Sequence, residues 1–202
     1  MKRFRAKKMA IGLMVLSVGW VLGCMGQTPP ASFYDLSVDA AMGSALRAGP
    51  SVSAVGIGPV RIPDALDRLQ IVTRQSPQRL DVSEFHRWGS RLREALPRVV
   101  AENIAALMPG TPVVVLPWVG IGRPSHRVTL DVVRFDGNPG DQVILAVNWS
   151  IVTPGEDAQT VLRRSRIEEP VASDSYADYV AAQSRALSAL SLEIARELAS
   201  KP

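Results

Sequence analysis

The stretch QVILAVNWSIVT, residues 142–153, carries the clearest secondary-structure signal in this 202-residue chain. Its apolar side chains alternate with smaller or polar ones, which is typical of a β-strand with one face buried. The sequence DGNPG at 136–140 is a strong turn signal, and it follows a second alternating stretch at 126–135. We therefore expect two successive strands, with one face of the second in the core. That face carries Val143, Leu145, Val147, Trp149 and Ile151.

Shorter apolar or alternating runs predict further strands on both sides of this pair. The turn at 154–157 leads into the last of them, whose Arg163, Arg164 and Arg166 suit an exposed sheet edge. Charged side chains at an edge discourage pairing with stray strands. The further strands are expected at residues 33–38, 51–60, 68–74, 79–82, 112–118 and 159–167.

Two segments show the three- and four-residue spacing of amphipathic helices. The first spans residues 84–108 and contains Pro97, so we expect a kink or break near 93–96. The second begins at a capping box formed by Ser175 and Asp178. The order strands, helix, strands, helix predicts a single α+β domain, with a mostly antiparallel sheet and two main helices packed on it. The stripe of the second helix is Tyr176, Val180, Gln183, Leu187, Leu190, Ile194 and Leu198.

The N-terminus has the layout of a secretory signal. Five basic residues fall within the first eight positions, and an apolar run at 9–22 follows and ends at Gly23-Cys24. This junction resembles the lipobox of bacterial lipoproteins, in which the cysteine is acylated after cleavage. We expect a signal peptide at 1–23, a lipidated tether at 24–32 and a domain at 33–202, with Cys24 as the lipid attachment site. The alternative is an uncleaved anchor with an incidental cysteine.

Charge and cysteine content exclude several classes of protein. The net charge of +4 depends on the predicted signal peptide, which contains five of the 23 basic residues and none of the 19 acidic ones. The mature chain therefore has a net charge of −1 and no basic excess for nucleic acid. A single cysteine rules out a disulfide framework or a cysteine-based zinc site.

No recognisable catalytic motif is present in the sequence. His86, close to Asp81 and Glu84, and His126 are expected at the surface, while Asp131 is expected half-buried and paired with an arginine. The paired glycines at 56–58 and 120–122 lack the third glycine of a dinucleotide-binding motif. Asp64 and Asp67 lack a third ligand for a metal. We expect no catalytic residue, cofactor or metal site.

The chain resembles the PqiC/YmbA-like lipoproteins, which are auxiliary lipoproteins of ABC-type transport systems. The most specific part is the block that runs from Pro59 through Ile62-Pro63 to Thr73-Arg74, and the resemblance covers nearly all of the mature chain. Leu69, where proline is common, and Pro97 depart from the family pattern. The other matching segments are Tyr34 with Leu36, Arg87-Trp88, Ala101-Glu102-Asn103, Leu116-Pro117-Trp118, 132–136 and Trp149.

The resemblance implies a role without catalysis, as a docking subunit anchored in the outer membrane and facing the periplasm. Such lipoproteins accompany a membrane permease and an MCE-domain protein, and they are thought to support lipid movement between the membranes and envelope integrity. Self-association would match a ring-shaped partner. The candidate partner surface comprises Arg61, Arg68, Arg74 and Trp118. The alternatives are a periplasmic module that holds an acyl chain itself, and a periplasmic hydrolase.

Overall fold

The computed structural model describes residues 29–38, 46–118, 120, 122–155 and 158–201. The chain divides into two units, Met1–Pro30 and Ala31–Pro202, and the fold is that of the second unit. The predicted signal peptide, Cys24 and most of the predicted tether lie outside the described residues.

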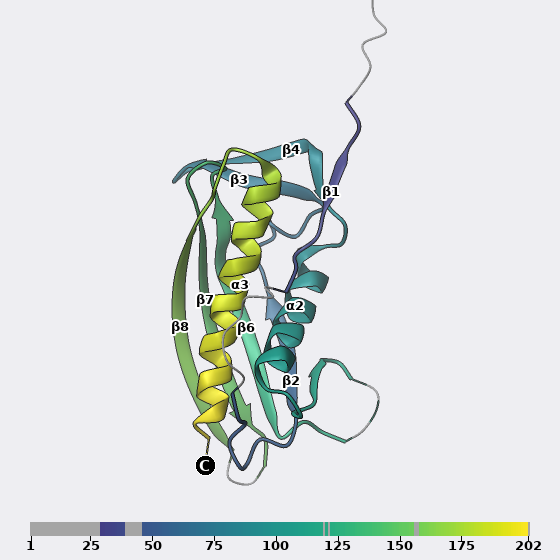
Figure 1. Cartoon of the computed structure of the whole chain (residues 1–202), viewed down its shortest axis with the longest axis vertical. Helices are drawn as coiled ribbons and strands as arrows, with labels where there is room; N and C mark the ends of the chain where they lie inside the picture. The colour runs from purple at the N-terminus through teal and green to yellow at the C-terminus, as the bar shows by residue number, and fades with distance from the viewer. Residues whose placement is uncertain (1–28, 39–45, 119, 121, 156–157, 202) are drawn as a thin grey trace, which may run out of the picture. The chain divides into compact units, whose positions relative to one another are not determined.

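The larger of two sheets, sheet B, has five strands in the order β5-β2-β6-β7-β8 (Figure 1). The β6–β7 and β7–β8 pairs are antiparallel, whereas β5 and β6 both run parallel to β2. The sheet is therefore mixed, a refinement of the mostly antiparallel sheet expected from the sequence. The strands are β5 (Val113–Val115), β2 (Val55–Arg61), β6 (His126–Gly137), β7 (Gln142–Thr153) and β8 (Gln159–Pro170).

The alternation at 142–153 marks a strand whose predicted face is buried. All five predicted core residues of β7 are buried, and Trp149 is 3% exposed. The indole N–H of Trp149 donates a 2.8 Å hydrogen bond to Ser165 Oγ on β8, so its polar atom is satisfied inside the core. The arginines of β8 are exposed at the sheet edge, as predicted.

Helices α2 (Leu92–Leu107) and α3 (Tyr176–Ala199) cover one face of sheet B (Figure 1). Helix α3 packs on β7 and β8, while α2 packs on β2 and β5. The predicted cap of α3 is present, because the Ser175 hydroxyl accepts a 3.1 Å hydrogen bond from the Asp178 amide. The predicted stripe of α3 is buried against the sheet, except for the half-buried Tyr176.

A second, three-stranded sheet, sheet A, has the order β1-β4-β3. Its strands are β1 (Ser32–Tyr34), β4 (Arg79–Trp88) and β3 (Gln70–Ser76). Residues 84–88 belong to β4, so the prediction that the first helix starts at Glu84 is wrong. Trp88 and Leu92 are both buried and four residues apart, which imitates a helical repeat. Pairing of His86, Arg87 and Trp88 with β1 decides in favour of the strand.

We expected a kink or break at 93–96, but helix α2 runs continuously through Pro97, so the break is absent. Because the helix starts at Leu92, Pro97 lies in its second turn and leaves only the Arg93 carbonyl without its usual partner. Gly89 makes the sharp change from β4 to α2. A Cβ atom at Gly89 would lie 2.7 Å from a carboxylate oxygen of Asp35, too close for any other residue without a shift.

Candidate functional site

An open groove of about 630 Å³ lies beside Trp118, at the start of β6. The Trp118 side chain is 51% exposed, which is unusual for the largest apolar side chain in proteins. Four prolines and two glycines shape the remaining wall. We call this the Trp118 groove, and its lining residues are Gly58, Pro59, Leu116, Pro117, Trp118, Gly122, Arg123, Pro124, Arg127 and Pro154.

Close packing and backbone conformation explain why glycine occurs at positions 56, 58 and 120, near this groove. A Cβ atom on Gly56 would lie 2.8 Å from Pro124 Cγ, so the absence of a side chain lets Pro124 and Leu116 settle on β2. Gly58 has φ +130°, a conformation that L side chains rarely adopt. Gly120 lies against the Trp118 indole, where a Cβ would be 2.6 Å from Nε1. These glycines shape the groove and need no phosphate ligand to explain them.

The charged lining residues of the groove are Arg123 and Arg127, both exposed. Arg127, Thr129 and Asp131 are alternate residues of β6, and their side chains point away from the core. Asp131 is half-exposed and lies 3.4 Å from the Nε of Arg61, so the predicted pairing of Asp131 with an arginine is confirmed. Sequence reasoning did not single out Arg127, although its place in the alternating pattern before Val128 indicated an outward side chain.

A second, smaller groove of about 370 Å³ lies between α2 and the edge strand β5. Trp118 lines this groove as well, so the indole forms a wall shared by both depressions. Ala101 and Ala105 of α2 and the three valines of β5 make it largely apolar, with Arg98 and Glu102 at the helix surface. Trp118 is therefore accessible from two sides.

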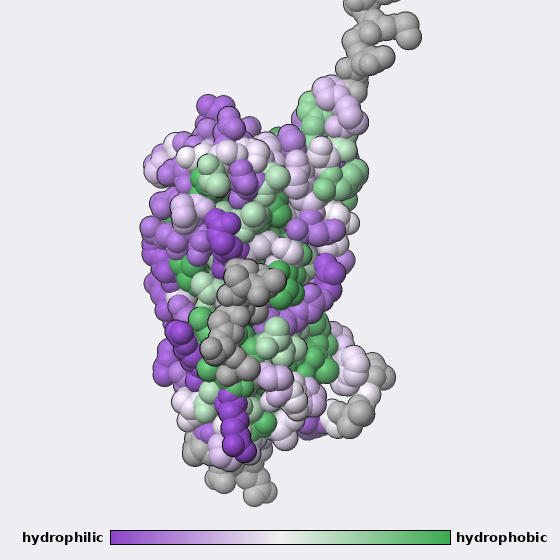
Figure 2. Space-filling model, viewed as in Figure 1, coloured by the Kyte–Doolittle hydropathy of each residue, from purple (hydrophilic) through white to green (hydrophobic). Residues whose placement is uncertain are grey.

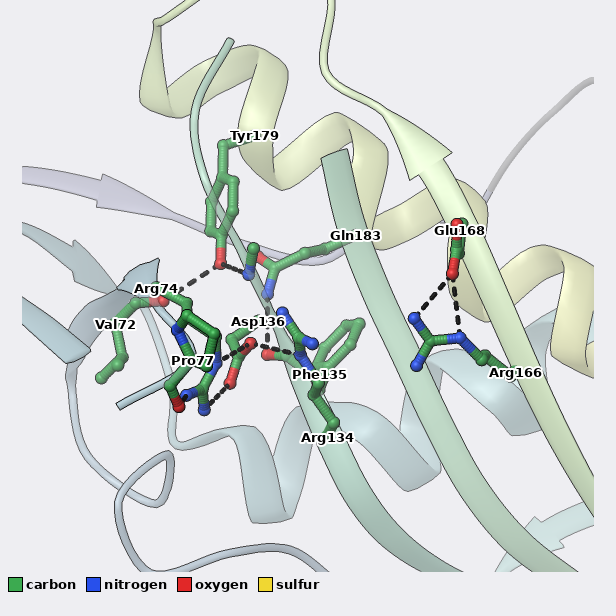
Figure 3. Close-up of polar contacts among 11 residues, drawn as sticks. Val72, Arg74, Pro77, Arg134, Phe135, Asp136, Arg166, Glu168, Tyr179 and Gln183 are labelled. Carbon is green, nitrogen blue, oxygen red and sulfur yellow. Dashed lines mark hydrogen bonds and ion pairs between the residues drawn. The ribbon is translucent and has the colours of Figure 1, made fainter. Parts of the chain in front are cut away.

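Arg74, also a candidate for partner binding, is committed to a structural contact (Figure 3). Its guanidinium binds both carboxylate oxygens of Asp136, at 2.7 and 2.8 Å, and also donates to the carbonyl of Pro77. Arg134 Nε donates to the same carboxylate at 2.7 Å. The Asp136 side chain is only 3% exposed, and its hydrogen bond raises the pKa of Arg74. This network joins β3 to β6.

The four candidate residues do not form one surface. Arg127, in the Trp118 groove, and Asp136, which binds Arg74, are nine residues apart on β6, roughly 30 Å at about 3.3 Å per residue. Arg61 lies nearer the groove, because its register partner is Asp131. Arg68 is half-buried on the connection into β3, and its Nε is inaccessible to solvent.

Neither histidine has the simple surface position expected. His126 is 1% exposed, which contradicts the prediction, because it occupies the inward phase of β6 together with Val128. Burial, followed by the nearby charge of Lys201, lowers the pKa of His126. His86 is half-buried, with Nδ1 2.8 Å from the hydroxyl of Tyr34 and its ring stacked on Tyr176 at 3.9 Å.

Within the described part of the chain, no three His, Cys, Asp or Glu side chains come together in a way that could hold a metal ion. None of the described helices is both long and apolar enough to cross a membrane. The space between sheet B and the two helices is occupied by one continuous cluster of buried apolar side chains.

Comparison with known proteins identifies structures with a similar fold and the family of this chain. The crystal structure of an uncharacterised protein superposes with a TM-score of 0.68 at 21% identity, covering 84% of this chain and 99% of the other. Protein XCC0632 from Xanthomonas campestris, of family DUF330, gives a TM-score of 0.62 at 17% identity, covering 81% and 92%. No curated protein matches the chain. The family model for the ABC-type transport auxiliary lipoprotein component matches residues 34–195, and the chain belongs to this family.

Proposed function

We propose that this protein is the docking subunit of an MCE-type ABC lipid transport system, held on the periplasmic face of the outer membrane through Cys24. The family supplies the association with ABC-type transport and the lipoprotein character. The MCE-domain protein and the permease are the partners that this proposal adds, together with a contribution to envelope integrity. The protein does not turn over a substrate in this role.

The half-exposed Trp118 is the observation that carries the docking role. Tryptophan and arginine dominate the energetics of protein interfaces, especially where they line a pocket that a partner side chain can fill. The Trp118 groove places one tryptophan beside Arg123 and Arg127. It therefore suits a partner segment with an apolar side chain for the indole and a carboxylate for the guanidinium groups.

The acyl-binding module and the hydrolase have less support. An acyl-binding module needs an enclosed apolar cavity, and the interior between sheet B and the helices is filled by core side chains in the described part of the chain. The largely apolar groove between α2 and β5 is an open depression at the edge of the sheet. A hydrolase needs a nucleophile within hydrogen-bond reach of a base. Ser125 Oγ lies 3.1 Å from Nδ1 of His126, but this hydroxyl already donates to the Ala54 carbonyl and accepts from two backbone amides. Among the described residues, no carboxylate is hydrogen-bonded to either histidine to complete a triad.

A pull-down of the mature domain from envelope extract tests the proposal. We expect recovery of an MCE-domain protein, identified by mass spectrometry. Recovery of no MCE-domain protein, combined with a hydrolytic activity in the purified domain, would replace docking by catalysis. The test variant is Trp118→Ala, which removes an exposed side chain. It should keep the melting temperature of the wild type but no longer recover the MCE-domain protein.

Density-gradient fractionation tests the membrane assignment separately. Position two of the mature chain is Met25, whereas aspartate at that position is the signal that retains lipoproteins in the inner membrane. We therefore expect the protein in outer-membrane fractions. Its appearance mainly with inner-membrane markers would contradict this part of the proposal and leave the docking role to be judged by the pull-down.

A further inference from the structure

Sheet A exposes two phenylalanines on the face that is turned away from the helices. Phe33 on β1 is 66% exposed and Phe85 on β4 is 38% exposed. Phe33 is the register partner of Arg87, and Phe85 lies two residues before Arg87 on the same strand. Residues in register share a face of a sheet, so Phe33 and Arg87 point the same way. The register of β4 with β3 shifts before Arg87. The outward position of Phe85 therefore rests on its exposure and on its neighbour His86, which turns inward to stack on Tyr176. We call Phe33, Phe85 and Arg87 the anchor-side patch.

The opposite face of sheet A shows why the patch points outward. Tyr34, His86 and Trp88 alternate with the patch residues, and they turn toward the body of the domain. The Tyr34 hydroxyl binds His86, His86 stacks on Tyr176 of α3, and Trp88 is 2% exposed. The orientation of the two phenylalanines is therefore fixed by contacts on the other side of the sheet.

The length of chain between Cys24 and the patch limits how far the patch can lie from a membrane. Ser32, the first residue of β1, is eight residues after Cys24. Eight residues span at most about 29 Å when fully extended. Apolar side chains lie over β1 at the upper right of Figure 2, where the chain enters the domain. If Cys24 carries acyl chains, the start of β1 is held within this distance of the lipid surface, with the patch on β1 itself and on the neighbouring strand β4.

From these observations we infer that the anchor-side patch inserts into the interfacial region of the phospholipid bilayer to which the protein is anchored. This inference rests on the proposed anchoring at Cys24. Aromatic side chains favour the membrane interface, where an apolar ring meets polar headgroups. A weak contact suffices, because the tether keeps the patch at high effective concentration beside the membrane.

The charges of β4 specify the lipid chemistry. Arg79 and Arg87 are balanced by Asp81 and Glu84 on the same strand, so the strand has no net charge to attract an anionic surface. The phenyl rings therefore supply the attraction. The contact forms on zwitterionic phospholipid and changes little with ionic strength, in contrast to a polybasic membrane site.

The test couples the mature chain, Cys24–Pro202, to maleimide lipid through its only thiol, in a phosphatidylcholine nanodisc that contains headgroup spin label. This chemical anchor does not depend on natural acylation, so failure of lipidation in the cell and failure of the patch are separate results. NMR line broadening of backbone amides reports the distance to the spin label. We expect the amides of Phe85 and Arg87 to be broadened several-fold more than those of Leu162 and Arg164 on β8.

A double variant, Phe33→Ser with Phe85→Ser, distinguishes insertion from simple proximity to the tether. We expect the excess broadening of β4 to fall by at least half in this variant, while Leu162→Ser, a similarly exposed apolar position on β8, leaves it unchanged. Both variants should melt near the wild-type temperature. Equal broadening of β4 and β8 in the wild type, or excess broadening that survives the double variant, would overturn the inference.

Discussion

Asp136 is the clearest case of a single residue that holds two parts of the fold together. The carboxylate is buried and accepts hydrogen bonds from Arg74 of β3 and Arg134 of β6. The adjoining Gly137 amide donates to the Tyr179 hydroxyl, which itself donates to the Val72 carbonyl. Sheet A, sheet B and α3 therefore meet through one polar network (Figure 3).

Replacement of Asp136 by asparagine should lower the free energy of unfolding by roughly 2–3 kcal/mol, because two arginines lose their charged partner. This lies below the 3–5 kcal/mol of a fully buried pair, since both arginines keep some contact with water. The control is Arg166→Ala, which removes an exposed pair with Glu168 and should cost less than about 1 kcal/mol. Urea denaturation measures both, and equal losses would contradict a special role for Asp136.

His126 makes stability depend on pH in a defined direction. Its pKa is lowered in the folded protein, mainly by burial, so the unfolded chain takes up a proton more readily as the pH falls through about 6.5. Acidification from pH 7 to pH 5 should therefore lower the melting temperature of the wild type more than that of His126→Gln. Differential scanning calorimetry at the two pH values checks this. Parallel losses in both proteins would show that His126 is not involved.

Local sequence patterns predicted the environment of a single residue where a strand or helix repeat, or a capping box, settled it. Trp149 in the core and the pairing of Asp131 with an arginine follow from their phase on β7 and β6. His126 has the inward phase of β6, but a polar residue at the entrance of a strand suggested exposure instead. Asp136 was expected in a turn because it begins the turn signal at 136–140. Its pairing with Arg74 could not be predicted locally, since the two residues are 62 positions apart.

Among the secondary-structure elements, α3 offers a direct test of core packing. Ile194 is fully buried in the stripe of this helix, whereas Arg196 is exposed two residues later. Ile194→Ala should cost about 2–5 kcal/mol through lost burial and the cavity left behind. Arg196→Ala should change the melting temperature little. Thermal unfolding of both variants provides the comparison, and similar small shifts would contradict the packing of α3.

The elements that the sequence predicted best are those with local signals. The capping box of α3 and the alternation of β7 depend only on neighbours along the chain. The parallel position of β2 between β5 and β6 depends on partners distant in sequence, which no local pattern contains. The same reason explains residues 84–88, where pairing with β1 outweighed a helix-like spacing.

In the domain as a whole, the proposed docking groove and the network that joins the two sheets are separated along sheet B. The Trp118 groove lies at the start of β6, and the network that joins sheet A lies at its end. Strand β1, which follows the predicted tether, belongs to sheet A. Strand β1 and the proposed docking groove therefore lie at opposite ends of the domain (Figure 1).

Lipidation of Cys24 is a prediction about the mature protein as a whole. Metabolic labelling with a fatty-acid analogue should mark the wild type and leave Cys24→Ser unlabelled, because the chain contains no other cysteine. Several acyl chains on one residue are needed for stable anchoring, since a single chain binds membranes only marginally. Label that persists in Cys24→Ser would show that the acyl group is attached elsewhere.

The affinity of the domain for the proposed MCE-domain partner decides whether the Trp118 groove is its docking site. Biolayer interferometry with the wild type, Trp118→Ala and Leu162→Ala compares two exposed apolar side chains, in the groove and on β8. Loss of an interface hot spot costs 2 kcal/mol or more, so Trp118→Ala should weaken binding at least about 30-fold, while Leu162→Ala stays within about threefold of the wild type. Equal affinities of the wild type and Trp118→Ala would contradict docking through the Trp118 groove.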